Sequence, residues 1–162
     1  MAEYALGPAN GSLRVFTTRQ GVAAKVGHDL VIEVGTWKAT LTTGDTPAID
    51  LEADSTSLQI IEGTGGLKPL SDKDRAEIKK NIDAKILKGQ PIRFTGSSQG
   101  ELELVGVTKP VTIALDIGDD GQFSGSVTIT QSDWGIKPYS GLMGALKVAD
   151  DVRIEVSGTL PG

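Results

Sequence analysis

The sequence of 162 residues contains no cysteine and a single histidine, His28. The lack of cysteine excludes disulfide bonds, thiolate metal sites and a cysteine nucleophile, and it is compatible with any cellular compartment. A serine triad would have to use His28, but Asp29 beside it would point to the opposite face of a strand, and there is no Gly-x-Ser-x-Gly turn. We therefore expect no catalytic residue; the alternative is an enzyme that acts on a lipid-like substrate through His28.

Long apolar runs and a basic face are missing as well. No apolar run is long enough to span a membrane, and residues 1–7 lack the basic and apolar regions of a secretory signal, so we expect a soluble, cytoplasmic chain. The net charge is −5, and the 16 basic residues cluster only at Lys79-Lys80. A protein that binds nucleic acid needs a basic face, so we expect no such partner.

What the chain does contain is turn-forming residues, with 21 glycines and 7 prolines. Between them, apolar and polar residues alternate, which is typical of half-buried strands and predicts an all-β, antiparallel domain spanning residues 1–162. Turns are expected at Gly44-Asp45, Gln99-Gly100 and Asp119-Asp120-Gly121, and a tight junction at Thr108-Lys109-Pro110. The expected strands cover residues 12–17, 29–42, 48–54, 92–98, 101–107, 109–116, 122–130 and 151–159.

One amphipathic helix is expected at residues 71–88. Ser71 is a suitable N-cap, and Gly89 follows the last helical residue, where glycine commonly ends a helix. Ile78, Ile82 and Ile86 recur every four residues and form one apolar face. About eight strands with one polar face can form a sandwich or close into a barrel, and the pattern alone leaves both open.

Other polar clusters have simple structural explanations. The carboxylates Asp50, Glu52 and Asp54 could hold a cation, but alternation with Ile49, Leu51 and Ala53 favours a solvated outer strand face. The glycine-rich residues 63–68 lack the Gly-Lys-Ser/Thr of a phosphate loop. We therefore expect no metal and no cofactor.

The apolar residues suggest an internal binding site. Residues 132–147 carry more apolar surface than a solvated loop needs, and we expect that segment to line a pocket mouth and contact the ligand tail or a membrane. Large aromatics often serve only packing, which is the alternative for both tryptophans. The expected ligand contacts are the strand residues Val15, Ile32, Leu51, Leu104, Ile113, Val127 and Ile129, the loop residues Trp134, Tyr139, Leu142, Met143 and Leu146, and His28 and Trp37.

Five short motifs follow one another along nearly the whole chain: Gly27-His28-Asp29-Leu30 with Trp37, Gly65-Gly66-Leu67, Gly106-Val107-Thr108-Lys109-Pro110-Val111, Ser132-Asp133-Trp134-Gly135-Ile136, and Leu146-Lys147-Val148-Ala149-Asp150-Asp151-Val152. Together they resemble the YceI-like family of lipocalin-like, polyisoprenoid-binding proteins. The resemblance implies a closed lipocalin-like barrel that binds a long apolar ligand, such as a polyprenyl phosphate or a quinone, for storage or carriage. Transient membrane contact and a homodimer are further expectations, and a filled barrel that acts through protein contacts is the remaining alternative.

Overall fold

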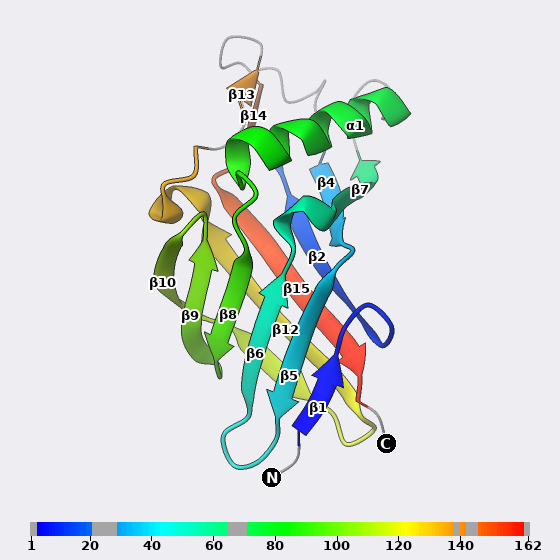
Figure 1. The fold of residues 1–162 in the computed structure, drawn as a ribbon, viewed down its shortest axis with the longest axis vertical. Helices are drawn as coiled ribbons and strands as arrows, with labels where there is room; N and C mark the ends of the chain where they lie inside the picture. Colours follow the sequence, from blue (N-terminus) through cyan, green and yellow to red (C-terminus); the bar gives the residue numbers. More distant parts are fainter. Residues whose placement is uncertain (1–2, 21–28, 65–70, 138–139, 142–145, 161–162) are drawn as a thin grey trace.

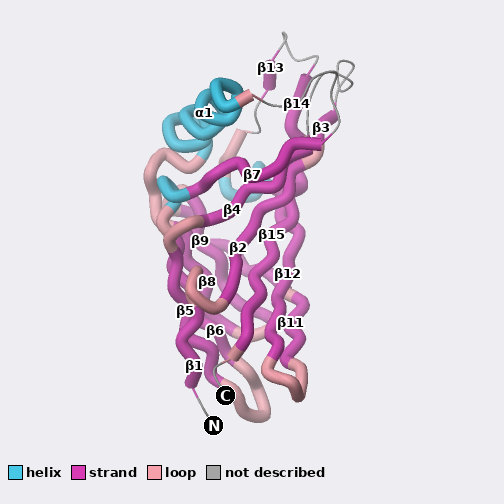
Figure 2. The backbone as a smooth tube through the Cα atoms, turned by 90° about the vertical axis from the view of Figure 1, so that its right-hand side faces the viewer, coloured by secondary structure: helices cyan, strands magenta, loops and turns pink. Residues whose placement is uncertain are grey.

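The computed structural model describes residues 3–20, 29–64, 71–137, 140–141 and 146–160. Two six-stranded antiparallel sheets face each other, and a helix, α1, lies across one end of them (Figures 1 and 2). β1 begins and β15 ends at the opposite end of the molecule (Figure 1). The expected all-β class with one amphipathic α-helix is confirmed.

The strands are short, as the frequent turn residues predict. The first sheet has the order β1 (Glu3–Leu6), β5 (Trp37–Thr42), β6 (Ala48–Ala53), β8 (Ile92–Gly96), β9 (Gln99–Leu104), β10 (Val107–Thr112). The second has the order β11 (Ala114–Ile117), β12 (Gln122–Thr130), β15 (Asp151–Thr159), β2 (Gly11–Thr17), β4 (Asp29–Val34), β7 (Leu58–Thr64). A small third sheet joins β13 (Ser140–Gly141), β14 (Leu146–Val148) and β3 (Arg19–Gln20).

The two large sheets are joined by bends in the chain. Within the described residues the strand pairings form two separate ladders and not one continuous ring, so the expected closure by strand pairing is not seen. Where the chain passes from one sheet to the other, its backbone changes direction, and the pairing between neighbouring strands is interrupted at that point. At Ile113, between β10 and β11, the backbone N–H still donates to the Ser98 carbonyl at 2.7 Å.

One expected strand, residues 29–42, is wrong as a single element. The chain bends at Gly35 and Thr36, which separate β4 from β5. β4 belongs to the second sheet and β5 to the first. The Gly35 N–H donates to the Ser57 carbonyl at 2.9 Å and the Thr36 N–H donates to Ser57 Oγ at 3.0 Å. These bonds, made to a residue distant in sequence, fix a bend that local alternation does not reveal.

Two expected turns are also displaced. Gln99 and Gly100 pair within β9, and the preceding turn lies at Ser97 and Ser98. Pro110 marks no junction but pairs with Glu101 inside β10, which is tolerated because β10 is an edge strand of its sheet and a proline there loses no ladder bond.

The hairpin between β11 and β12 is confirmed. Gly121 has a φ of 84°, in the left-handed region that glycine adopts without strain. The Gly118 N–H donates to the Gln122 carbonyl at 2.8 Å, and Asp120 Oδ1 accepts a hydrogen bond from the Gln122 N–H at 3.1 Å. The acidic pair therefore serves turn geometry, as its Asp-Gly signal predicts.

The helix follows its sequence signals closely. α1 (Asp72–Asn81) begins after Ser71, which forms a reciprocal capping box with Asp74, and it continues into a π-helical segment, η3 (Ile82–Ile86). Lys88 and Gly89 then adopt φ values of 56° and 71°, which stop the helix. The expected span of residues 71–88 is confirmed.

Both tryptophans are buried and belong to the hydrophobic core. Trp134 is 3% exposed and lies in η4 (Gln131–Trp134), and its Nε1–H donates to the Leu102 carbonyl at 2.9 Å. Trp37 is 5% exposed, but its buried Nε1 has no hydrogen-bond partner among the described residues. The two indoles thus differ in one hydrogen bond while sharing the same degree of burial.

This difference predicts unequal effects of one substitution. Trp134→Phe removes the hydrogen bond to the Leu102 carbonyl and should lower the free energy of unfolding by about 0.5–1.5 kcal/mol beyond the change in packing. Trp37→Phe is the matched control, and it should cost less because no described hydrogen bond is lost. Urea denaturation of both variants measures the difference, and equal losses would contradict the assigned role of the Trp134 hydrogen bond.

Candidate ligand-binding cavity

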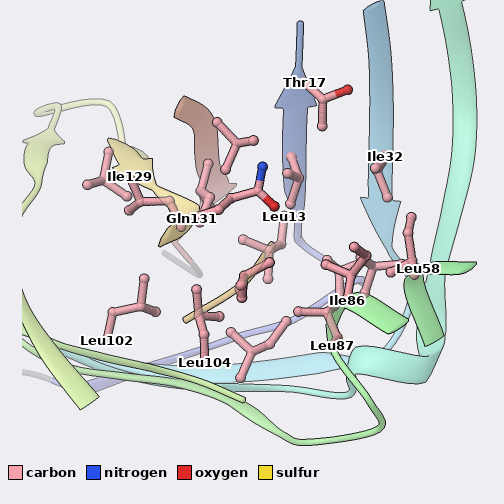
Figure 3. Close-up of a pocket in the computed structure, with 18 of the residues that line it drawn as sticks. Leu13, Thr17, Ile32, Leu58, Ile86, Leu87, Leu102, Leu104, Ile129 and Gln131 are labelled. Atoms are coloured by element: carbon pink, nitrogen blue, oxygen red, sulfur yellow. The ribbon is translucent and has the colours of Figure 1, made fainter. Parts of the chain in front are cut away.

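A cavity of about 560 Å³ lies between the two sheets beneath the helix (Figure 3). Alternation along the strands directs one set of side chains inward from each sheet, and the helix adds the face formed by Ile78, Ile82 and Ile86. The volume is within the range of about 300–1,000 Å³ typical of small-molecule pockets. A filled barrel would not contain such a space, so this alternative loses its structural basis.

The lining is almost entirely aliphatic. Phe94 is the one aromatic residue among the described residues that line the cavity. Six lining residues carry polar side chains: Thr17, Asp74, Glu77, Asn81, Ser126 and Gln131. The aliphatic lining comprises Leu13, Val15, Leu30, Ile32, Val34, Ile49, Leu51, Leu58, Ile78, Ile82, Ile86, Leu87, Ile92, Leu102, Leu104, Val111, Ile113, Val127, Ile129, Ile136, Val148, Val152, Ile154 and Val156.

Such a lining suits a hydrocarbon ligand. Branched aliphatic side chains offer dispersion contacts and no hydrogen bonds, so they favour a ligand whose surface is apolar along most of its length. Polar groups that could orient one end of a ligand are few, and three of them, Asp74, Glu77 and Asn81, come from α1. The other three, Thr17, Ser126 and Gln131, come from β2, β12 and the turn that follows β12.

Gln131 is the exception inside the apolar lining. Its side chain lies among Leu13, Ile129 and other apolar groups (Figure 3), and the residue is only 8% exposed. The backbone N–H donates to the Asp150 carbonyl at 2.8 Å, and Nε2 donates to the Ala149 carbonyl at 3.1 Å. These two bonds fix the side chain at the end of β12.

Seven of the nine predicted contacts whose side chains the structure describes line the cavity. The seven strand residues named from the sequence all do so: Val15, Ile32, Leu51, Leu104, Ile113, Val127 and Ile129. Trp37 and Trp134 do not line it; their burial follows the packing alternative. His28, Tyr139, Leu142 and Met143 lie outside the described residues, as does the side chain of Leu146 within β14. The predicted role of these five side chains in binding stays a prediction.

The sequence analysis omitted several lining residues that it could have found. The apolar face of the helix was recognised, but Ile78, Ile82 and Ile86 were not assigned to the pocket. Leu13 lies two positions before Val15 on β2, so the same alternation points to it. Gln131 carried no comparable signal, because only the tertiary fold turns its amide inward.

The three carboxylates Asp50, Glu52 and Asp54 have separate surroundings and form no shared site. Asp50 and Glu52 are exposed on β6, and Asp54 caps the short helix η2 (Ser55–Ser57). The hydroxyl and the backbone N–H of Thr56 donate to Asp54 Oδ1 at 2.6 and 2.9 Å, and they lower the pKa of the Asp54 carboxyl. No cluster of three or more metal-ligating side chains occurs in the part of the chain that the structure describes.

No helix among the described residues has the length and apolar character required to cross a membrane.

Comparison with solved structures shows the fold. BcnA from Burkholderia cenocepacia is similar with a TM-score of 0.64 and 14% sequence identity, over 91% of this chain and 94% of BcnA. A polyisoprenoid binding domain from Saccharophagus degradans, implicated in plant cell wall breakdown, is similar with a TM-score of 0.60 and 9% identity, over 99% of both chains. The expected lipocalin-like fold is thereby confirmed.

The sequence of the chain matches one protein family. No curated protein matches the chain. The YceI-like domain, in contrast, matches residues 4–160, which include every strand of the two large sheets except the first residue of β1. The chain therefore belongs to the YceI-like domain family.

Proposed function

We propose that this protein binds one long apolar ligand, an isoprenoid lipid, without covalent attachment in the cavity between its sheets. The observation that carries the proposal is the aliphatic lining of a cavity of about 560 Å³. The similar Saccharophagus degradans structure is described as a polyisoprenoid binding domain, which supports the same ligand class. The role would be storage, shielding or carriage of the lipid, and it requires no chemical reaction.

The physical basis of binding is the removal of hydrocarbon from water. Each methylene group that leaves water contributes about 0.8 kcal/mol, so affinity should rise with each isoprene unit that fits inside. Once the cavity is full, further units remain in solvent and add little. A plot of affinity against tail length should therefore rise and then level off.

A substitution that places a larger side chain inside the cavity tests this expectation. Val127 on β12 lines the cavity, and Val127→Phe should weaken binding of the longest tail that the wild-type protein accommodates by about tenfold, equivalent to the displacement of about two methylene groups. Binding of shorter tails should change less, because they leave room for the ring. Fluorescence titration with isoprenoid alcohols of increasing length measures both effects.

The neighbouring Thr128 offers a matched control. It is exposed on the other face of the same strand, so Thr128→Val should leave the whole length series unchanged. Equal loss of affinity in both variants, or no dependence on tail length in the wild-type protein, would place the ligand outside this cavity.

The enzyme alternative is tested through the single histidine. If binding depends on apolar contacts, His28→Ala removes at most one polar contact and should change affinity by no more than about tenfold, or about 1.4 kcal/mol. Isothermal titration of the folded variant with the same isoprenoid measures this. Complete loss of binding in a folded His28→Ala protein would instead favour a site organised around the histidine.

A further inference from the structure

The Gln131 amide has a fixed orientation. The Ala149 carbonyl oxygen can only accept a hydrogen bond, so the amide nitrogen of Gln131 must face it, and the 3.1 Å contact joins these two atoms. No donor to the amide oxygen, Oε1, occurs among the described residues, and this oxygen keeps some accessible surface. It belongs to a cavity-lining side chain that is more than nine-tenths buried.

The turn that carries Gln131 is held rigidly. The Ser132 N–H donates to Asp150 Oδ1 at 2.8 Å, and Ser132 Oγ donates to Asp150 Oδ2 at 2.5 Å. On the other side, the Ala149 N–H donates to the Thr18 carbonyl at 2.8 Å. Gln131 is thus anchored to a segment that is itself anchored to the end of β2, which leaves the amide little freedom to turn its oxygen elsewhere.

A second unpaired polar atom lies near this end of the cavity. Thr17, the last residue of β2, lines the cavity, and its buried Oγ1 has no partner among the described residues. β15 lies between β2 and β12, and the pairing register places Thr17 in one row with Ile129, two residues before Gln131. The apolar lining is therefore interrupted at one end, where a ligand's polar group would find partners.

The charges of the described lining disfavour one class of headgroup at this place. Asp74 and Glu77 are the charged residues among the described lining, and no lysine or arginine is in that set. An anionic phosphate placed here would lose its hydration and would find carboxylates without a cation. A neutral headgroup avoids this penalty.

We infer that the cavity selects an isoprenoid whose polar end carries a neutral hydroxyl group, which donates its hydrogen bond to Gln131 Oε1. The inference rests on the proposed function and names the headgroup of its ligand. A quinone carbonyl, an ether and an ionised phosphate only accept hydrogen bonds, so none of them satisfies an amide oxygen. A prenyl alcohol does so, and a hydroquinone carries the same donor.

The test compares ligands with one tail and different ends. Geranylgeraniol, its methyl ether and its monophosphate are titrated into the protein at neutral pH. The alcohol should bind about tenfold more tightly than the ether, because a bound ether shuts water away from Oε1 and donates nothing to it, and more tightly than the phosphate. Prenylated hydroquinone and quinone of equal tail length form a second pair, and comparison of the hydroquinone with the alcohol identifies which source of the hydroxyl is preferred.

Two variants assign the preference to Gln131. Gln131→Met keeps the length of the side chain and removes the acceptor, so the alcohol should lose its advantage over the ether while the ether binds as before. Ser132→Ala is the matched control, because it removes a hydrogen bond to Asp150 from the same turn and keeps the amide. The alcohol-to-ether ratio should survive in that variant.

The outcomes separate this inference from the function on which it rests. If none of the three geranylgeranyl ligands binds, the carrier function and the inference both fail. If all three bind but the ether equals the alcohol, or the phosphate binds most tightly, the carrier function stands and the hydroxyl assignment is overturned. If Gln131→Met does not fold, the wild-type ligand series alone decides between these results.

Discussion

The structure depends on one constraint: aliphatic side chains pack between two sheets without filling the space that the sheets enclose. Both sheets direct branched aliphatic residues inward, and Phe94 alone adds an aromatic ring to the described cavity lining. Protein interiors are normally packed as densely as organic crystals, so an apolar space of about 560 Å³ lacks contacts that a ligand can supply. A ligand that binds only the folded chain would also stabilise it.

The helix and the turn after β12 add residues to the cavity that the two sheets form. α1 and η3 together present Ile78, Ile82 and Ile86 to the cavity, and the capping box at Ser71 and the left-handed Lys88 and Gly89 fix where this helical segment begins and ends. At the same end, the turn that follows β12 is tied through Asp150 and Ala149 to the chain beside β2. The rigid sheets thereby hold a buried amide at a defined place in an otherwise apolar lining, which makes it suited to orient a ligand.

Local patterns predicted the elements whose signals are complete within a few residues. The hairpin at Asp120 and Gly121 and the helix that begins after Ser71 both depend on contacts between near neighbours, so sequence was sufficient for them. The bend at Gly35 and Thr36 was not predicted, because Ser57 of another element fixes it. Pro110 was misread for a similar reason: only strand order shows that β10 is an edge.

The sequence by itself determined the all-β class, the helix, the absence of cysteine chemistry and the aliphatic face of the strands, because composition and period two are properties of the chain. It also identified seven residues that line the cavity. Tertiary structure alone decided that the strands form two sheets joined at bends, that both tryptophans pack away from the cavity, and that Gln131 turns its amide inward. These features depend on hydrogen bonds and packing between segments distant in sequence, such as the bond of Trp134 to Leu102 and that of Gln131 to Ala149, and no local pattern encodes such pairs.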